Sequence, residues 1–128
     1  NVAVLPGPNG QVYVYVYPAQ TDAKRWPLGG DTRFLVSADG AKIVATRRLH
    51  KSILEFDPSQ GGATPAAGYH TAILDDLPED TDVLYVLSRR PSIAEYILTP
   101  KFGYVILPNG AILSLGTRAD AEKKMKAQ

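Results

Sequence analysis

The sequence predicts a mixed α/β domain of the α+β type, built on a mainly antiparallel sheet with one helix after an acidic loop and a second at the C-terminus. Two observations support the sheet: the alternating stretch VYVYVY at residues 12–17, and Asp-Gly or Asn-Gly turns between apolar runs at residues 39–40 and 109–110. A third observation supports the first helix. Residues 78–91 open with acidic side chains and close with two arginines and a proline, the charge order that a helix dipole favours.

The chain of 128 residues is expected to form one domain, because this length is typical of single domains. Its composition, 45% hydrophobic and 21% charged, is that of an ordinary globular protein. Within it we expect an N-terminal strand and loop over residues 1–30, a core over residues 31–115 and a helical C-terminal segment over residues 116–128.

Charge, hydropathy and cysteine content exclude several function classes. Fourteen basic and thirteen acidic side chains leave a net charge of +1, so we expect no nucleic-acid partner. No apolar run approaches the roughly 18 residues that span a bilayer, so we expect no membrane span. The absence of cysteine removes thiol catalysis, disulfides and cysteine-ligated zinc. The chain begins at Asn1 and not at methionine, as a mature product with its signal segment removed would, which favours an exported or periplasmic location.

Residues 12–17 form the clearest predicted strand, because valine and tyrosine alternate along it. The three valines then share one face, and Tyr13, Tyr15 and Tyr17 share the other. We interpret the tyrosine row as a second, half-buried face beneath another element. A ligand-binding platform made of the same three rings is the alternative.

The remaining elements are predicted from local patterns. Residues 18–32 contain two prolines and two glycines and are expected to be a connecting loop. Residues 50–56 either continue the preceding strand or begin a short new one. Short strands are expected over residues 69–74 and 94–98, the second leading into the last hairpin. Residues 117–128 predict a polar C-terminal helix.

The predicted core consists of the apolar members of these periodic runs, each of which would contribute roughly 1.5 to 3 kcal/mol on burial. They are Val12, Val14, Val16, Leu35, Ile43, Ile73, Val86, Ile97, Val105 and Ile112.

Two common catalytic signatures are missing from the sequence. No GxSxG stretch offers a nucleophilic serine on a sharp turn. The pair Gly29 and Gly30 is followed by a strand-like segment without a suitably placed lysine, so it does not predict a phosphate-binding loop.

The stretch GYHTAILDDLPEDTD at residues 68–82 places one of the two histidines beside a loop with five carboxylates. One interpretation is a metal site. The other is a partly buried, hydrogen-bonded His70 followed by a solvated loop and a helix N-terminus, capped by Asp80 or Thr81. Calcium is a further possibility, but the spacing lacks the EF-hand order and its turn glycine.

The element order over residues 31–115, with GYHT, the proline-and-acid loop, DVLYVL and PSIAEYILTP, resembles the JAMM/MPN domain family, especially its bacterial branches. In that family the motif reads HxH followed by SxxD. Its two histidines and aspartate hold zinc, and an upstream glutamate acts as general base on the zinc-bound water. Three protein ligands leave the fourth position of a tetrahedral zinc site for that water.

The resemblance implies a metal motif that is only partly present. His70 matches the first histidine and Asp82 the aspartate, whereas Ala72 stands at the second histidine and Glu79 at the serine. Two ligands make a poor catalytic zinc site, so the resemblance implies a degenerate domain without peptidase activity. Restoring the motif with Ala72→His is expected to tighten zinc binding.

Two further positions remain open under the resemblance. The upstream glutamate has no direct counterpart, and Asp31 and Glu55 are the candidate catalytic acids. His50 could act as a substitute ligand, but a histidine at the edge of RRLHKS is more often a surface or hydrogen-bonded side chain.

Three functions follow as expectations. The first is a degenerate JAMM/MPN-like binding or scaffold module with a protein partner and no cofactor. The second is a zinc-dependent hydrolase of peptidase or isopeptidase type, with a variant metal site built from His70, Asp82 and an acid such as Asp31 or Glu55. The third is a β-rich accessory domain that binds its partner by strand addition beside residues 12–17. Metal content of the purified protein would separate the second from the other two.

Overall fold

The computed structural model of the protein describes residues 1–60, 62 and 65–127 and confirms a mixed α+β fold. In chain order the elements are β1 (Val2–Pro6), the short 3₁₀ turn η1 (Pro8–Gly10), β2 (Val12–Val16), β3 (Trp26–Gly29), β4 (Thr32–Val36), β5 (Ile43–Arg48), β6 (Ile53–Phe56), β7 (Ala67–Thr71), α1 (Asp80–Ser88), β8 (Ala94–Leu98), β9 (Phe102–Ile106), β10 (Ile112–Thr117) and α2 (Arg118–Lys126). No helix in the described ranges is both long and apolar enough to cross a membrane.

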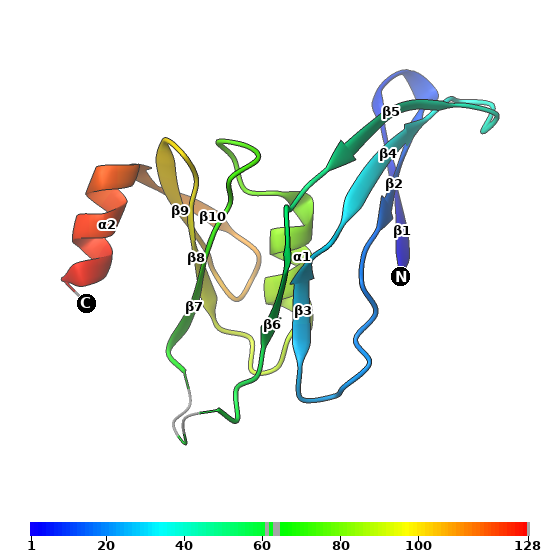
Figure 1. The fold of residues 1–128 in the computed structure, drawn as a ribbon. Coiled ribbons are helices and arrows are strands. Elements are labelled where there is room, and N and C mark those ends of the chain that lie inside the picture. The colour runs from blue at the N-terminus through cyan, green and yellow to red at the C-terminus, as the bar shows by residue number, and fades with distance from the viewer. Residues whose placement is uncertain (61, 63–64, 128) are drawn as a thin grey trace.

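The described strands form three sheets (Figure 1). One has the order β1-β2-β4-β5 and another the order β10-β9-β8-β7, while β3 and β6 pair separately. All pairings are antiparallel except that of β7 with β8. Helix α1 packs against β3 and β9 and so links two of the sheets, and α2 packs on β9 and β10. The predicted, mainly antiparallel architecture is therefore confirmed.

The predicted turns occur where the sequence places them. Gly40 and Gly110 both have positive φ, +74° and +85°, at the β4–β5 and β9–β10 turns. Only glycine takes this conformation without steric cost, which explains the Asp-Gly and Asn-Gly pairs. The residues between β1 and β2 form a third hairpin connection, through η1.

Residues 18–32 are not a continuous loop, because they contain β3. This strand pairs with β6, and Pro27 lies opposite Glu55. A proline is tolerated in a strand that has a free edge, where its missing N–H removes no ladder hydrogen bond. The proline and glycines of this segment therefore led to the wrong prediction. Residues 53–56 form a short new strand, which was one of the two predicted alternatives.

Helix α1 was predicted from its charge order, and it forms. Its N-cap is Glu79, not Asp80 or Thr81. The Glu79 N–H donates to Asp82 Oδ2 at 2.7 Å and the Glu79 side chain accepts from the backbone of Asp82, which together make a capping box. The helix ends before Arg89.

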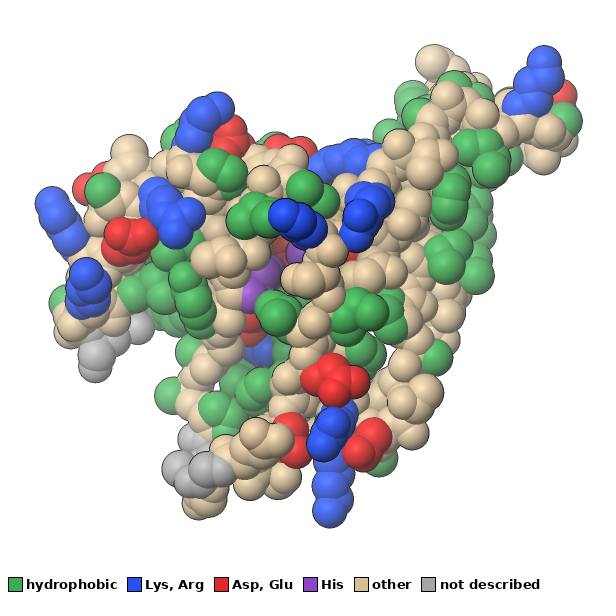
Figure 2. Space-filling view, viewed as in Figure 1, with side chains coloured by type: hydrophobic (Ala, Val, Ile, Leu, Met, Phe, Trp, Pro, Cys, Tyr) green, Lys and Arg blue, Asp and Glu red, His purple; other side chains and the backbone are tan. Residues whose placement is uncertain are grey.

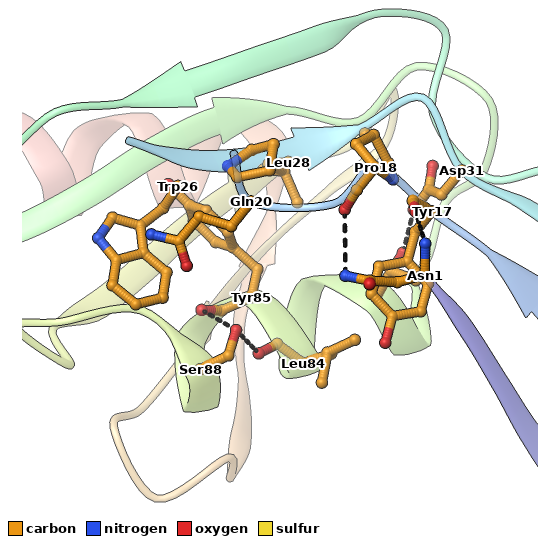
Figure 3. A pocket seen from close by; sticks show the side chains of 13 residues that line it. Asn1, Tyr17, Pro18, Gln20, Trp26, Leu28, Asp31, Leu84, Tyr85 and Ser88 are labelled. Atoms are coloured by element: carbon orange, nitrogen blue, oxygen red, sulfur yellow. Dashed lines mark hydrogen bonds between the residues drawn. The ribbon is translucent and has the colours of Figure 1, made fainter. Parts of the chain in front are cut away.

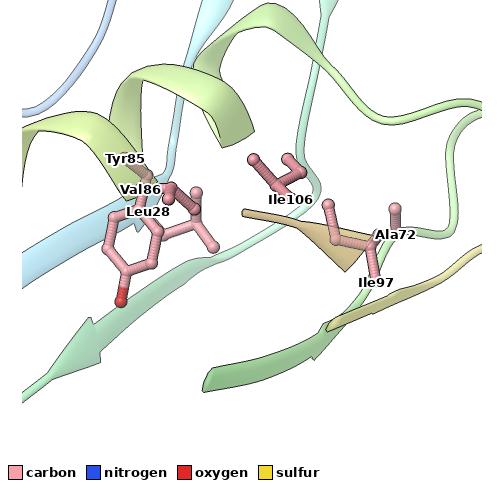
Figure 4. Packing of buried hydrophobic residues seen from close by; sticks show 6 residues of the cluster. All are labelled: Leu28, Ala72, Tyr85, Val86, Ile97 and Ile106. Atoms are coloured by element: carbon pink, nitrogen blue, oxygen red, sulfur yellow. The ribbon is translucent and has the colours of Figure 1, made fainter. Parts of the chain in front are cut away.

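The core lies where α1 meets β3, β8 and β9 (Figure 4). Its buried members are Leu28, Ala72, Tyr85, Val86, Ile97 and Ile106. Of the predicted core residues, Val86, Ile97 and Val105 are buried. Val12, Val14 and Leu35 are only half-buried.

Four predicted core residues are exposed instead: Val16, Ile43, Ile73 and Ile112. Val16 and Ile43 lie on the β1-β2-β4-β5 sheet, in which Tyr15 is the one buried side chain of β2. Tyr15 is 4% exposed, and its hydroxyl donates to Asp80 at the start of α1. Tyr13 and Tyr17 are half-buried, as predicted for the tyrosine face, and so are Val12 and Val14. Burial of the valine face is therefore wrong at Val16, which is 43% exposed.

A buried histidine and carboxylate cluster

Three side chains with metal-ligating atoms converge between the sheets. His50 directly follows Leu49 after β5, His70 lies on β7, and Asp82 lies in the first turn of α1. His50 Nε2 lies 2.9 Å and His70 Nε2 lies 3.2 Å from the same oxygen, Asp82 Oδ1. The two rings are 7% and 4% exposed and Asp82 is fully buried. Their ligand atoms all lie within 4.8 Å of one another, which makes them the one candidate metal group found among the described residues.

The Nδ1 atom of each histidine contacts a second carboxylate, on the side of the ring away from Asp82. His50 Nδ1 lies 2.9 Å from Asp31 Oδ1, and His70 Nδ1 lies 2.8 Å from Glu95 Oε1. A carboxylate can only accept, so both Nδ1 atoms donate, which turns both Nε2 atoms toward Asp82. Backing of this kind is typical of metal-ligating histidines, where it fixes the ring orientation and tautomer.

The Asp31 carboxylate is itself fixed on several sides. Asp31 immediately precedes β4, and its backbone carbonyl accepts the Leu49 N–H at 3.1 Å. Its side chain accepts the backbone N–H of His50 at 3.1 Å and the hydroxyl of Thr81. The β4–β5 hairpin and α1 therefore set the orientation of His50 together.

The Glu95 carboxylate is fixed by a buried arginine. Arg89 Nη1 donates to Glu95 Oε2 at 2.7 Å, and its Nη2 donates to the carbonyls of Ile93 and Ala94. The Arg89 guanidinium also lies 4.6 Å from the centroid of the Tyr85 ring. Arg89 and Glu95 thus complete a continuous chain of contacts that leads to His70.

The electrostatic environment follows from these contacts. Burial disfavours the charged form of His50, but hydrogen bonds with Asp31 and Asp82 outweigh it and raise the pKa of His50 to about 10. The pKa of His70 is raised for the same reason, by Asp82 and Glu95 against burial. Burial acts in the opposite sense on Asp82, yet its two histidine partners hold the pKa of Asp82 well below its usual range.

Glu79, next to this cluster, is a buried carboxyl of a different kind. It pairs with Arg47, which also contacts Asp75 at 2.6 Å. Burial raises the pKa of Glu79 to about 7 even though the Arg47 guanidinium opposes the shift. Glu79 therefore titrates near neutral pH in the metal-free protein.

Two of the three distances between the ligand atoms are close to those of a tetrahedral zinc site, and all three atoms lie within 4.8 Å of one another. Zinc bonds to imidazole nitrogen and carboxylate oxygen are about 2.0–2.1 Å long, so two ligands of a tetrahedral ion lie about 3.3 Å apart. The two nitrogen-to-oxygen separations here, 2.9 and 3.2 Å, are close to that value. His70 Nε2 is moreover buried, and its 3.2 Å contact with Asp82 Oδ1 is an ion-pair contact that lacks good hydrogen-bond geometry. A buried nitrogen without a well-formed hydrogen bond is unusual in a folded protein, and a metal ion would supply the partner.

The cluster can be reached from solvent. A cavity of about 370 Å³ is lined by both histidines and by residues of β6 and of the segments that flank it. In Figure 2 the purple histidine atoms are visible in a hollow between β7 and β6. A separate cavity of about 190 Å³ lies beside Asp31, between α1 and the N-terminal segment, and neither histidine lines it (Figure 3).

The predicted site residues divide into three groups. His70 and Asp82 lie together, as the sequence predicts. Asp31, a candidate catalytic acid, belongs to the cluster, but it contacts His50 Nδ1 and not the Nε2 atom that faces Asp82. Glu55, the other candidate, is exposed on β6 and pairs with Arg25 at 3.3 Å.

The tyrosine row is separate from this cluster. Tyr13 lies under the Arg33 guanidinium, 4.6 Å from its ring centroid. Tyr15 is bonded to Asp80, and Tyr17 lines the separate cavity of Figure 3. The strand that carries them is internal in its sheet, between β1 and β4, so it has no free edge beside which a partner strand could add.

His50 was expected to be a surface or hydrogen-bonded side chain, and the structure supports the second alternative, because His50 is buried and contacts Asp31 and Asp82. The signal that could have placed it is the β4–β5 hairpin, in which Thr32 pairs with Arg48. Continuing this register by one residue places Asp31 opposite Leu49, next to His50. Glu95 was also missed, since its contact with His70 depends on the parallel pairing of β7 and β8.

Comparisons of the chain with protein-family models, curated proteins and solved structures found no match.

Proposed function

We propose that the protein is a metal-dependent hydrolase that binds zinc through His50, His70 and Asp82. The observation that carries the proposal is the convergence of two imidazole Nε2 atoms on one carboxylate oxygen, with each Nδ1 atom held by a further carboxylate. Two histidines and one carboxylate form a ligand set known from catalytic zinc sites.

The charges of the cluster support a divalent cation. Without metal, the carboxylates of Asp31, Asp82 and Glu95 carry three negative charges, and two imidazolium rings with Arg89 carry three positive charges. Zinc binding requires both imidazoles to be neutral. Replacing two protons by one divalent cation leaves the net charge of this buried cluster at zero, so the site can hold the ion without an uncompensated charge.

The chain supplies three ligands, and a tetrahedral zinc ion has a fourth position for water. Bound zinc lowers the pKa of such a water and makes it a nucleophile near neutral pH. Asp31 and Glu95 would hold the imidazoles as neutral Nδ1–H tautomers, with Nε2 free to ligate. The cavity lined by both histidines would admit the substrate.

The JAMM/MPN resemblance is compatible with this proposal. In the family the second histidine is two residues after the first, where this chain has Ala72. We propose that His50 supplies this missing ligand from a different strand end. The competing proposal, a scaffold module without metal, predicts that the same cluster remains a set of buried ion pairs.

Metal content tests the proposal directly. Protein purified without added zinc and then incubated with one equivalent of zinc should retain about one ion per chain after gel filtration. His50→Ala and Asp82→Ala should each abolish this retention, because two ligands hold zinc poorly. Glu122→Gln, which removes a half-buried carboxylate paired with Arg118 on α2, is the matched control and should retain the metal. If neither the wild type nor Glu122→Gln retains zinc, the metal site is refuted and the scaffold module is favoured.

A further inference from the structure

The cavity of about 370 Å³ beside the histidine cluster is lined by several hydrogen-bond donors. Besides His50 and His70, its polar lining consists of Lys51, Ser52 and Thr71. The side chains of these three residues, one ammonium and two hydroxyls, have no hydrogen-bond or ion-pair partner among the described residues. Three donor side chains around one cavity are therefore available to an external ligand that accepts hydrogen bonds.

The charge of this cavity favours an anion. No Asp or Glu side chain of the described residues lines it. The histidine cluster beside it has no net charge, either with two imidazolium rings or with zinc and two neutral imidazoles. Lys51 therefore gives the cavity a net positive charge. Figure 2 shows further Lys and Arg side chains around the hollow in which the histidine atoms are visible.

The segment that carries Lys51 and Ser52 is fixed by its backbone. Gly29 on β3, with φ +90°, lies so close to this segment that a Cβ atom at position 29 would be 2.1 Å from the Ser52 carbonyl oxygen. Arg48 Nη2 donates to the Lys51 carbonyl at 2.9 Å. Thr71 is the last residue of β7, which pairs with β8. The donors are thus carried by segments that are already ordered, which lowers the entropic cost of binding a ligand.

We propose that the substrate carries a phosphate monoester group, which Lys51, Ser52 and Thr71 bind beside the metal centre. A phosphate monoester has three strong acceptor oxygens and close to two negative charges, which suit a donor set of one ammonium and two hydroxyls. A carboxylate, with two oxygens and one charge, matches this set less completely. The substrate class rests on the proposed hydrolase function. Hydrolysis would join the water oxygen to phosphorus, break the P–O bond to the alcohol and transfer one water proton to the alcohol oxygen.

Binding can be tested apart from hydrolysis in metal-free protein. The probes are phenyl phosphate and benzoate, which carry the same ring, so that their comparison isolates the phosphate group. Phenyl phosphate should shift the amide NMR signals of Lys51, Ser52 and Thr71. It should also bind about tenfold more tightly than benzoate, because it makes more charge-assisted hydrogen bonds.

Variants locate the phosphate group. Lys51→Gln should weaken binding of phenyl phosphate about tenfold, because it removes one charge-assisted hydrogen bond. Thr71→Val keeps the shape of the side chain, removes its hydroxyl and should weaken binding about fivefold. Lys42→Gln is the matched control, because Lys42 is an exposed lysine in the β4–β5 turn that does not line the cavity, and it should leave binding unchanged.

Release of inorganic phosphate from phenyl phosphate then tests hydrolysis in protein that retains zinc. Equal binding of phenyl phosphate and benzoate, equal weakening by Lys51→Gln and Lys42→Gln, or no binding to the wild type would each overturn the phosphate site. Binding without release by protein that retains zinc would overturn the substrate assignment. Protein that binds phenyl phosphate through Lys51 but retains no zinc supports the phosphate site and refutes only the metal-dependent hydrolase, so the two failures are distinguishable.

Discussion

Gly68 on β7 lies so close to Glu95 on β8 that a Cβ atom at position 68 would be 1.9 Å from Glu95 Oε2. It would also be 2.9 Å from Arg89 Nη1. The parallel register places Gly68 directly opposite Glu95, so the missing side chain leaves the space in which the Arg89–Glu95 ion pair lies. Glycine at this position is therefore required by packing behind His70 and not by backbone conformation.

Gly68→Ala is expected to destabilise the fold and to weaken zinc binding. The added methyl group must displace the Glu95 carboxylate, and overpacking of a buried site costs about 1–3 kcal/mol. The displacement also removes the acceptor that orients His70. Chemical denaturation and zinc titration measure the two effects.

The control for Gly68→Ala is Gly40→Ala in the β4–β5 turn. Gly40 has φ +74° and open space around it, so alanine strains the backbone without touching the cluster. We expect Gly40→Ala to lower stability and leave zinc affinity unchanged. Equal loss of zinc affinity in both variants would show that stability alone, and not the position of Glu95, determines binding.

Glu95→Gln is expected to weaken zinc binding about 10–100-fold, the usual effect of removing a carboxylate that orients a ligating histidine. It should also destabilise the metal-free protein by about 3–5 kcal/mol, because Arg89 is fully buried and loses its ionic partner. The double variant Glu95→Gln with Arg89→Met removes both charges and should recover part of the stability but none of the zinc affinity. Recovery of both together would mean that Glu95 has no specific effect on His70.

The sequence predicts those parts of the fold that depend on local chemistry. The Asp-Gly and Asn-Gly turns require positive φ, and the charge order of residues 78–91 favours a helix, so both are evident without long-range information. The convergence of His70 and Asp82 was predicted for a related reason, since a strand and the helix that soon follows it are close in sequence. Strand β3 was missed because Pro27 is acceptable only on a strand with a free edge, which sequence alone does not reveal.

The position of His50 shows why its contacts with Asp31 and Asp82 were not predicted. Asp31 and His50 meet only if the β4–β5 register is known to within one residue, and a bulge between Leu35 and Val36 shifts that register. A shift of one residue would turn every side chain to the opposite face. The contact of His70 with Glu95 depends on parallel pairing across α1, for which the chain has no local signal.

Ala72→His is expected to destabilise the protein without tightening zinc binding. The sequence alone predicted a gain of affinity, but Ala72 is 5% exposed and packs in the core with Leu28 and Ile97. A larger, polar ring at this position overpacks the core and costs about 1–3 kcal/mol or more. Isothermal titration with zinc and urea denaturation test this. A clear gain in zinc affinity would show that position 72 faces the metal and would contradict the assignment of His50 as the second histidine ligand.

Zinc affinity is expected to fall steeply as the pH is lowered. The stability of the metal-free protein is expected to fall as the pH rises above neutral. The pKa of His50 is raised to about 10 in the folded protein, so its contribution is fully present below the unfolded pKa of about 6.5 and is lost as the pH rises through about 10. Glu79, whose pKa is raised to about 7, adds stability below its unfolded pKa of about 4.3 that is lost as the pH rises through about 7. The pKa of Asp82 is lowered, so its contribution is present above the unfolded value of about 3.9 and is lost in acid.

Together these shifts place the stability maximum of the metal-free protein near pH 4, with a first decline as Glu79 ionises toward pH 7 and a second as His50 loses its proton toward pH 10. Zinc competes with the imidazole protons, so saturating zinc should stabilise the protein most at neutral to alkaline pH and move the maximum upward. Urea denaturation between pH 4 and 10, with chelator and with zinc, measures both curves. In Glu122→Gln the two curves should keep this separation, whereas in His50→Ala they should coincide. If zinc does not change the wild-type curve at any pH in this range, His50 and His70 are partners in buried ion pairs and not metal ligands.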